Sequence, residues 1–336
     1  MMRPLLLALL AAAPLHAEVP RVVADIPPVQ GLVASVMGGL GAPDLLVPAG
    51  ASPHHFALKP SDARALQNAD LVVRVGEALT PGIGKSIAAL SAGATVLDLS
   101  GLPGTLALDM REEAVFAGAD AAQDGGDDHG GHGGHDDHDD HAGQDHAAHD
   151  DHDDHGHDDH GHHHDGLDPH MWLAPQNARL WLTAIAEALA EADPENAATY
   201  RGNAATAEAE IDAAMARARA RLEPLAGSRF VVFHDAYQYL ERSLGLTVLG
   251  AVQMSDATAP SPARLAALRD AIAATGADCV FAEPQFDPRL IAAVSEGTGI
   301  RVAELDPLGS ALPAGAAFYP ALIDDLSGRI AECAAP

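Results

Sequence analysis

The chain has 336 residues, 48% of them hydrophobic, and a formal net charge of −29 at pH 7. A chain of this length and apolar content can build two domains with cores of their own, which excludes a small scaffold held together by disulfides. The negative charge excludes nucleic acids and anionic membranes as partners, because both are bound by basic surfaces.

Residues 1–17 predict a signal peptide. Arg3 supplies the positive charge, residues 5–13 form a short apolar run, and residues 15–17 offer a cleavage site near Ala17. The apolar run is too short to span a bilayer, and no cysteine follows it to carry a lipid. We therefore expect the mature protein to lie outside the cytoplasm; the alternative is that this segment forms a buried helix of the mature fold.

Four short apolar runs in the next part of the chain predict strands. They cover residues 21–26, 44–47, 70–75 and 95–99. Helical patterns lie between them, including an apolar stripe that consists of Val29, Leu32, Val33, Val36 and Met37. Strands that alternate with helices are typical of a parallel sheet flanked by helices. We therefore predict an N-terminal α/β lobe over residues 18–193.

A low-complexity insertion interrupts this lobe at residues 120–165. It holds sixteen of the 48 acidic residues and none of the 19 Lys and Arg residues, so the rest of the chain carries a net charge near −13. Gly, Asp and His dominate it, and no aliphatic side chain is larger than Ala. Such a segment cannot bury enough apolar surface to offset its ordering entropy, so we expect it to be disordered.

The insertion also contains fourteen of the nineteen histidines. These are His129, His132, His135, His138, His141, His146, His149, His152, His155, His157, His160, His162, His163 and His164. Their side chains bind divalent metal ions, but each site must be ordered as its ion binds, which weakens the binding. We expect an accessory, low-affinity metal-binding tract; a solvated spacer is the alternative.

An alanine-rich stretch at residues 194–223 predicts a long helix that links two lobes. After Pro194 it contains no proline and only one glycine. A helix of this length extends roughly 40 Å, at 1.5 Å per residue. A shorter helix precedes it, with an apolar face made by Leu180, Trp181, Ala184, Ile185, Ala188 and Leu189.

The last part of the chain, residues 224–336, repeats the pattern of the first lobe. Strand-like runs cover residues 229–233, 247–252, 278–282 and 301–305. Ser261 and Pro262 mark the start of a helix, because serine is a preferred N-cap and proline a preferred first residue. The predicted fold class is therefore α/β, with two similar lobes that each contain a four-stranded parallel sheet flanked by helices.

Only four histidines lie outside the signal peptide and the insertion. His54, His55 and His234 follow predicted strands, and His170 precedes a helix. Ligands bind outside the carboxyl ends of parallel strands, and imidazoles suit zinc with four-coordinate geometry. We therefore predict a metal site where these segments meet, although imidazoles also suit copper, nickel and iron. An acid or a water would complete the coordination, and Asp306, at the end of the last strand, is the candidate acid. A lone histidine at a strand end is more often structural, and Asp306 could instead cap a turn.

The two cysteines, Cys279 and Cys333, are expected to form a disulfide in an oxidising compartment. Their bridge would stabilise the fold by roughly 3–4 kcal/mol in the chain-entropy model. A cysteine metal site would need more thiols. The sequence contains no HExxH, GxSxG or paired CxxC motif, so nothing in it indicates a nucleophile paired with a base.

Five stretches resemble one protein family along nearly the whole mature chain. They are ASPHHFALKPSDARALQNADLVV, DPHMWLAP, FVVFHDAYQYL, CVFAEPQF and LDPLG. Together with the histidine-rich insertion, they are similar to the periplasmic solute-binding proteins of zinc ABC importers (ZnuA-type), within the wider class that binds zinc or manganese. The resemblance implies two four-stranded α/β lobes, a connecting helix, and a metal ion in the cleft between them.

Matched motif by motif, the resemblance implies His54, His170, His234 and Asp306 as metal ligands. Relatives that select manganese carry glutamate where this chain has His234, so the histidine favours zinc. Some zinc-binding relatives carry a glutamate before the first ligand, where this chain has Pro53, which cannot ligate. This departure leaves Asp306 or water as the fourth ligand, and His55 is a second choice only.

The family also pairs cysteines placed like Cys279 and Cys333. The resemblance implies a periplasmic monomer that is not an enzyme, binds Zn²⁺ with high affinity and delivers it to the membrane permease of an ABC transporter. The insertion would collect zinc weakly, and Asp235 and Glu283 would orient ligand imidazoles. A zinc storage protein and a hydrolytic zinc enzyme, with water activated by three histidines, are the alternatives.

Overall fold

The computed structural model describes residues 19–111, 113, 115–116, 166–253 and 260–335. The predicted signal peptide at 1–17 and the predicted insertion at 120–165, with its fourteen histidines, lie outside the described residues. Within the described part of the chain, every helix is too short or too polar to cross a membrane.

The first lobe contains a parallel four-stranded sheet, as the sequence predicts. Its strand order is β2-β1-β3-β4, and all three neighbouring pairs are parallel. The strands are β1 (Val22–Ala24), β2 (Asp44–Leu45), β3 (Leu71–Arg74) and β4 (Thr95–Asp98). The helices between them are α1 (Pro27–Met37), α2 (Pro60–Asn68) and α3 (Gly84–Leu90).

The second lobe repeats this topology with the order β6-β5-β7-β8, again entirely parallel. Its strands are β5 (Arg229–His234), β6 (Thr247–Gln253), β7 (Cys279–Ala282) and β8 (Arg301–Glu304). Its helices are α6 (Gln238–Leu244), α7 (Pro262–Thr275) and α8 (Arg289–Ser295). As predicted, Ser261 caps α7, and its side chain accepts a hydrogen bond from the Arg264 backbone N–H.

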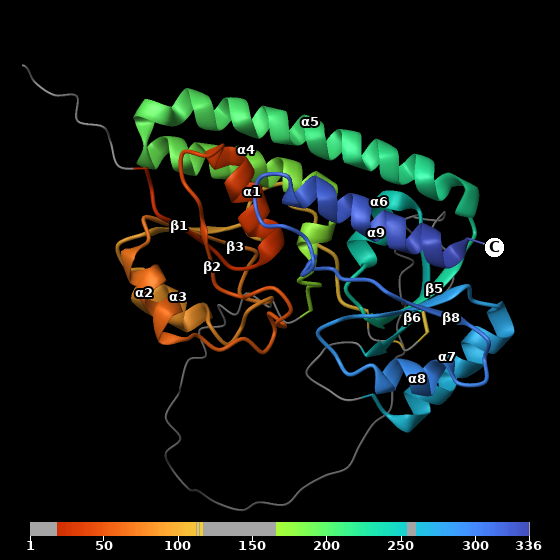
Figure 1. The fold of residues 1–336 in the computed structure, drawn as a ribbon. Coiled ribbons are helices and arrows are strands. Elements are labelled where there is room, and N and C mark those ends of the chain that lie inside the picture. Colours follow the sequence, from red (N-terminus) through yellow and green to blue (C-terminus); the bar gives the residue numbers. More distant parts are fainter. Residues whose placement is uncertain (1–18, 112, 114, 117–165, 254–259, 336) are drawn as a thin grey trace, which may run out of the picture.

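Three helices join the lobes: α4 (Pro175–Ala192), α5 (Ala197–Leu222) and α9 (Phe318–Ala334). Figure 1 shows α5 running along one side of both lobes, with α4 and α9 packed beneath it. The long helix begins at Ala197 rather than at Pro194, because Pro194–Asn196 form a 3₁₀ turn. Asp193 holds this turn by accepting hydrogen bonds from the Asn196 amide and the Tyr200 hydroxyl.

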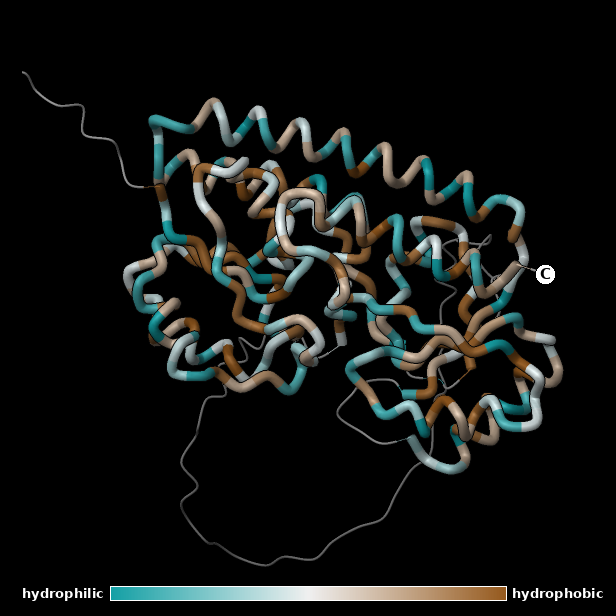
Figure 2. Tube along the Cα trace, in the orientation of Figure 1, coloured by the Kyte–Doolittle hydropathy of each residue, from teal (hydrophilic) through white to brown (hydrophobic). Residues whose placement is uncertain are grey.

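The central strands of each sheet are buried on both faces, and their successive residues enter different cores. Val22 and Ala24 belong to a central core that continues under both sheets, whereas Val23 packs on the opposite face against α2 and α3. Phe230 and Val232 of β5 also face the central core, and their neighbour Val231 faces α7 and α8. This two-residue period is the expected consequence of the strand pleat. Figure 2 shows hydrophobic residues concentrated along the strands.

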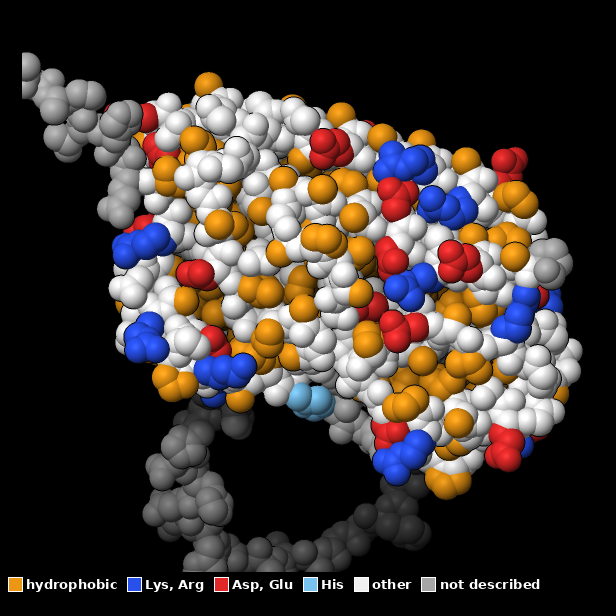
Figure 3. All heavy atoms as spheres, viewed as in Figure 1, with side chains coloured by type: hydrophobic (Ala, Val, Ile, Leu, Met, Phe, Trp, Pro, Cys, Tyr) orange, Lys and Arg blue, Asp and Glu red, His pale blue; other side chains and the backbone are white. Residues whose placement is uncertain are grey.

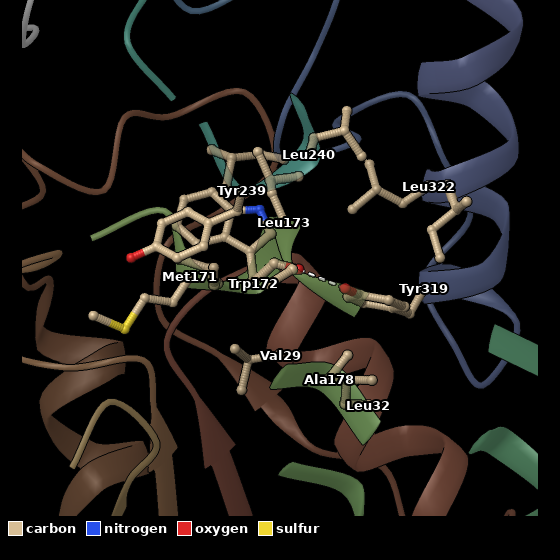
Figure 4. Packing of buried hydrophobic residues seen from close by; sticks show 14 of the residues in the cluster. Val29, Leu32, Met171, Trp172, Leu173, Ala178, Tyr239, Leu240, Tyr319 and Leu322 are labelled. Atoms are coloured by element: carbon tan, nitrogen blue, oxygen red, sulfur yellow. Dashed lines mark hydrogen bonds between the residues drawn. The ribbon is translucent and has the colours of Figure 1, made fainter. Parts of the chain in front are cut away.

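The short 3₁₀ turn η2 (Met171–Leu173) anchors the junction of the two lobes. The Trp172 indole N–H donates to the Pro307 carbonyl at 2.8 Å, and the Tyr319 hydroxyl donates to the Trp172 carbonyl at 2.5 Å. Figure 4 shows Trp172 between Tyr239 and Tyr319, within the buried cluster. The segment directly after His170 is therefore fixed to the second lobe.

The two cysteines form the predicted disulfide. The Cys279–Cys333 bond joins β7 to α9 across a sequence separation of 54 residues. It ties the last helix of the chain to a central strand of the second sheet.

Candidate metal centre

Three histidines from distant parts of the chain converge between the lobes. His54 lies in the loop between β2 and α2, His170 precedes η2, and His234 is the last residue of β5. The His170 Nε2 atom lies 3.3 Å from Nε2 of His54 and 3.1 Å from Nε2 of His234. Figure 3 shows histidine atoms at the surface where the two halves meet. The sequence prediction that these three residues come together is consistent with this geometry.

The separations match those of ligands around one tetrahedral zinc ion. Zn–N bonds of 2.0–2.1 Å at the tetrahedral angle place two ligand nitrogens about 3.3 Å apart. The three ligand nitrogens all lie within 4.8 Å of one another. Among the His, Cys, Asp and Glu side chains of the described residues, these three histidines form the group that could hold a metal ion. One ion could therefore contact all three imidazoles with little movement of the chain.

Buried carboxylates hold two of the imidazoles through their other ring nitrogen. Asp168 Oδ1 lies 2.7 Å from His170 Nδ1, and Glu283 Oε1 lies 2.7 Å from His234 Nδ1. In its ionised form each carboxylate only accepts hydrogen bonds, so Nδ1 of the ring beside it then carries the hydrogen, which leaves the Nε2 lone pair for a metal. A carboxylate that binds the second ring nitrogen of a ligand histidine fixes the tautomer and the orientation of that ring.

Local sequence explains the first of these contacts, and strand pairing explains the second. Asp168 lies two residues before His170 and also accepts its backbone N–H at 2.9 Å. Glu283 directly follows β7, the strand paired with β5, so both side chains leave the same edge of the sheet. The role predicted for Glu283 is consistent with this contact. Asp168 was not predicted, although its place in DPH, two residues from a ligand, is a usable signal.

Burial keeps the centre in a form that can bind metal. Burial lowers the pKa of His170 well below its usual value of 6.5, and the neighbouring His234 lowers it further. The His170 imidazole is therefore neutral at neutral pH. Burial also raises the pKa of Glu283, and it raises that of Asp168 to about 7.

The cavity between the imidazoles has a volume of about 10 Å³. This is close to the space that one water molecule needs in a protein interior. Both lobes line it, with Pro53 and Trp172 on one side and Phe286 and Leu308 on the other. A cavity of this size suits a single ion.

Asp306 lies at the expected end of the last strand, but outside the group of three histidines. Its buried carboxylate accepts hydrogen bonds from the Gln285 amide and from the backbone N–H groups of Leu308 and Ser310, at 2.8, 2.9 and 2.6 Å. His55 is exposed and also lies outside the group. Asp235, predicted to orient an imidazole, forms an ion pair with Arg111.

Comparisons with known sequences agree with this geometry. A family model described as "Zinc-uptake complex component A periplasmic" matches residues 22–333. The chain is 50% identical over 324 residues to the high-affinity zinc uptake system protein ZnuA of Paracoccus denitrificans, covering 96% of this chain and 94% of that protein. It is 41% identical over 312 residues to the protein of the same name from Brucella abortus, covering 93% and 91%.

Solved structures show the same fold. A crystal structure of ZnuA superposes with a TM-score of 0.70 at 23% identity, covering 94% of this chain and 99% of that one. A zinc-bound ZnuA variant that lacks residues 138–173 of its own sequence also gives a TM-score of 0.70 at 23% identity, covering 94% and 98%. The match of the family model along nearly the whole described chain, together with relatives above 40% identity, shows that this protein belongs to the ZnuA family of periplasmic zinc-uptake components, which are transport proteins and not enzymes.

Proposed function

We propose that this protein captures Zn²⁺ in the periplasm, between its two lobes, and delivers it to the membrane permease of an ABC importer. The observation that carries the proposal is the convergence of three imidazole Nε2 atoms from distant segments. The His170 atom lies 3.3 Å from that of His54 and 3.1 Å from that of His234. The names of the relatives support zinc as the cargo.

The chemistry of the donors favours zinc over harder divalent ions. All three converging atoms are imidazole nitrogens, which suit zinc, whereas manganese and magnesium prefer carboxylate and carbonyl oxygens. The proposed ligands are His54, His170 and His234. Because ligands come from both lobes, an importer that separates the lobes would break the site and release the ion.

Asp306 remains the proposed fourth ligand, with water as the alternative. To reach an ion, its carboxylate would exchange the hydrogen bond from Gln285, or those from Leu308 and Ser310, for a metal bond. A zinc-bound structure with anomalous scattering at the zinc edge distinguishes a carboxylate from a water. Asp306→Asn should weaken binding strongly if the carboxylate is a ligand, and only slightly if water takes the fourth position.

The finer parts of the proposal concern residues outside the described part of the chain. We propose that a signal peptide, cleaved near Ala17, exports the protein, and that it works as a monomer. The fourteen histidines of residues 120–165 would collect zinc with low affinity before the cleft binds it tightly.

Isothermal titration of the full chain with zinc tests the function. His54→Ala, His170→Ala and His234→Ala should each remove the tight binding event, because two imidazoles cannot hold zinc as three do. His55→Ala is the matched control, since this exposed neighbour lies outside the group of three. Retention of tight binding by His54→Ala together with its loss in His55→Ala would contradict the ligand assignment.

Deletion of residues 120–165 tests the accessory tract. The deletion should lower the number of zinc ions bound per chain and leave the tight event unchanged. If the tight event disappears with the segment, the high-affinity site does not consist of the three cleft histidines alone.

A further inference from the structure

A segment that leaves the first sheet crosses to the second lobe beside the metal centre. This strap, residues 106–111, follows β4 and begins at Leu106, whose backbone N–H and carbonyl both bind the Asn177 side chain of α4. Farther on, Phe116 donates its backbone N–H to the Leu249 carbonyl of β6 at 2.7 Å. The chain thus reaches the outer strand of the second sheet before the insertion starts.

The strap is bonded to the segment that carries the ligand His170. The Met110 N–H donates to the Gly166 carbonyl at 2.7 Å, and the Asp168 N–H donates to the Leu108 carbonyl at 2.8 Å. These two bonds form an antiparallel bridge of strap and return segment. The strap therefore fixes the backbone of Asp168, which itself orients His170.

Arg111, at the end of the strap, is bonded to the segment that carries the ligand His234. Its guanidinium donates Nε–H to both oxygens of Asp235, at 3.1 and 2.9 Å, and a second nitrogen also binds this carboxylate. Asp235 directly follows His234 and its side chain is only 4% exposed. The pair is bidentate and largely buried, the geometry in which an arginine restrains a carboxylate most strongly.

Two further contacts fix the guanidinium itself. Glu241 of α6 accepts from it at 2.7 and 3.3 Å. The Phe116 ring lies beneath it, with Cζ of Arg111 3.6 Å from the ring centroid. Arg111 thus has a defined position between the strap and the second lobe, with its side chain only 22% exposed.

We propose that Arg111 is a positioning residue of the zinc site, which fixes the segment that carries His234 against the segment that carries His170. The link is independent of any metal: it runs from His170 through Asp168 and the strap to Arg111, and from there through Asp235 to His234. It holds the two Nε2 atoms at zinc-binding separation before an ion arrives. This inference rests on the proposed function, since it assumes that both histidines bind zinc.

Removal of Arg111 should therefore make the site looser without removing a ligand. Partners outside the ligand shell typically contribute 10–100-fold to metal affinity. We expect Arg111→Ala to raise the rate of zinc dissociation about tenfold, because the two imidazoles separate more readily. The rate of association should change little, since all three ligands remain.

The experiment follows zinc release from the full chain to a chromophoric chelator by stopped flow, at constant ionic strength. Arg111→Ala and Asp235→Asn should accelerate release equally, and the double variant should add nothing, because both remove one contact. Arg111→Lys, which keeps the charge but not the bidentate geometry, should give an intermediate rate and serves if the alanine variant does not fold. Arg217→Ala is the matched control: it removes another bidentate arginine–aspartate pair, the one with Asp324 of α9, which lies outside the link between the two histidines, and it should release zinc within twofold of the wild-type rate.

Two results would overturn the inference. One is a wild-type release rate in Arg111→Ala and Arg111→Lys. The other is an Arg217→Ala variant that releases zinc as fast as Arg111→Ala, which would point to a general effect of losing an arginine–aspartate pair. His234→Ala, measured beside them, separates the two proposals: if it still binds zinc tightly, the proposed function fails, whereas loss of binding there with unchanged release in the Arg111 variants sinks only this inference.

Discussion

The two lobes share one topology but use the same edge of their sheets differently. In each, a buried carboxylate ties together the carboxyl ends of the two central strands. In the first lobe, Asp25 follows β1 and accepts the Val75 N–H beyond β3 at 2.7 Å. In the second, Glu283 follows β7 and accepts from His234 at the end of β5, from the backbone N–H at 3.4 Å and from Nδ1 at 2.7 Å.

The difference shows how a structural tie becomes part of a binding site. Asp25 is fully buried and, among the residues that the structure describes, accepts its hydrogen bonds from the backbone N–H groups of Val75 and Ile26. Glu283 holds an imidazole whose opposite nitrogen faces the other histidines. The same kind of carboxylate therefore stabilises the fold in one lobe and orients a ligand in the other. Substitutions in the two lobes should accordingly separate stability from zinc affinity.

The largest effect expected is on the stability of the second lobe, which alone carries a disulfide. Cys279→Ala combined with Cys333→Ala should lower the free energy of unfolding by about 4 kcal/mol, because the open chain gains the entropy of a 54-residue loop. Urea denaturation measures the loss. Hydrogen exchange should show amides of β7 losing protection while those of β3 keep theirs. Equal loss in both sheets would mean that the lobes unfold as one unit.

The next largest effect concerns the carboxylate that orients His234. Glu283→Gln should weaken zinc binding about tenfold, because a neutral amide orients the imidazole less firmly and makes its Nε2 less basic. Isothermal titration gives the affinity. Asp25→Asn is the matched change in the first lobe and should leave zinc affinity unchanged. If both substitutions weaken zinc binding equally, the distinction between the two carboxylates is wrong.

The repeated strand-and-helix pattern was enough to predict the fold. Short apolar runs bounded by turn residues mark the strands, most clearly the central strands β1, β3, β5 and β7, because these are buried on both faces. The start of the long helix was less predictable. Pro194 and Glu195 suit a helix start, yet Asp193 holds them in a 3₁₀ turn through hydrogen bonds to Asn196 and Tyr200.

The three converging histidines were predictable because the two lobes contain few histidines, and these lie at the end of a strand or in the turns between strands and helices. The contacts that hold these histidines in place were less predictable. The Arg111–Asp235 pair joins residues 124 positions apart, and no local sequence pattern predicts it. Asp306 lies just beyond the carboxyl end of β8, as predicted, but the hydrogen bonds of its carboxylate depend on the conformation of the loop that follows. Gly309 adopts φ +63° there, and an added Cβ would lie 2.9 Å from Leu312.

A further expected effect is a pH dependence of stability that arises from Asp25 in the first lobe. Burial raises the pKa of Asp25 to about 7 in the folded protein, from 3.8 for a free side chain. The folded state therefore binds a proton more tightly than the unfolded state, so this group's contribution to stability is present at low pH. It is lost as pH rises from about 4 to 7, by up to about 1.4 kcal/mol per pH unit.

Asp25→Asn tests this contribution, because the amide carries no charge at any pH. Relative to this variant, the metal-free wild-type protein should lose stability between pH 5 and pH 7 and little more by pH 8, because the unfolded state releases this proton near pH 4 and the folded state only near pH 7. Urea denaturation at pH 5, 6, 7 and 8 in the presence of a chelator measures the difference. At low pH the wild type should be the more stable, since an amide has one acceptor oxygen for the N–H groups of Ile26 and Val75 where the carboxyl group has two oxygens. If the stabilities of the wild type and of Asp25→Asn change in parallel with pH, Asp25 ionises as readily as an exposed carboxylate. The contact of Asp25 with the Val75 N–H would then not depend on the burial of its carboxyl group.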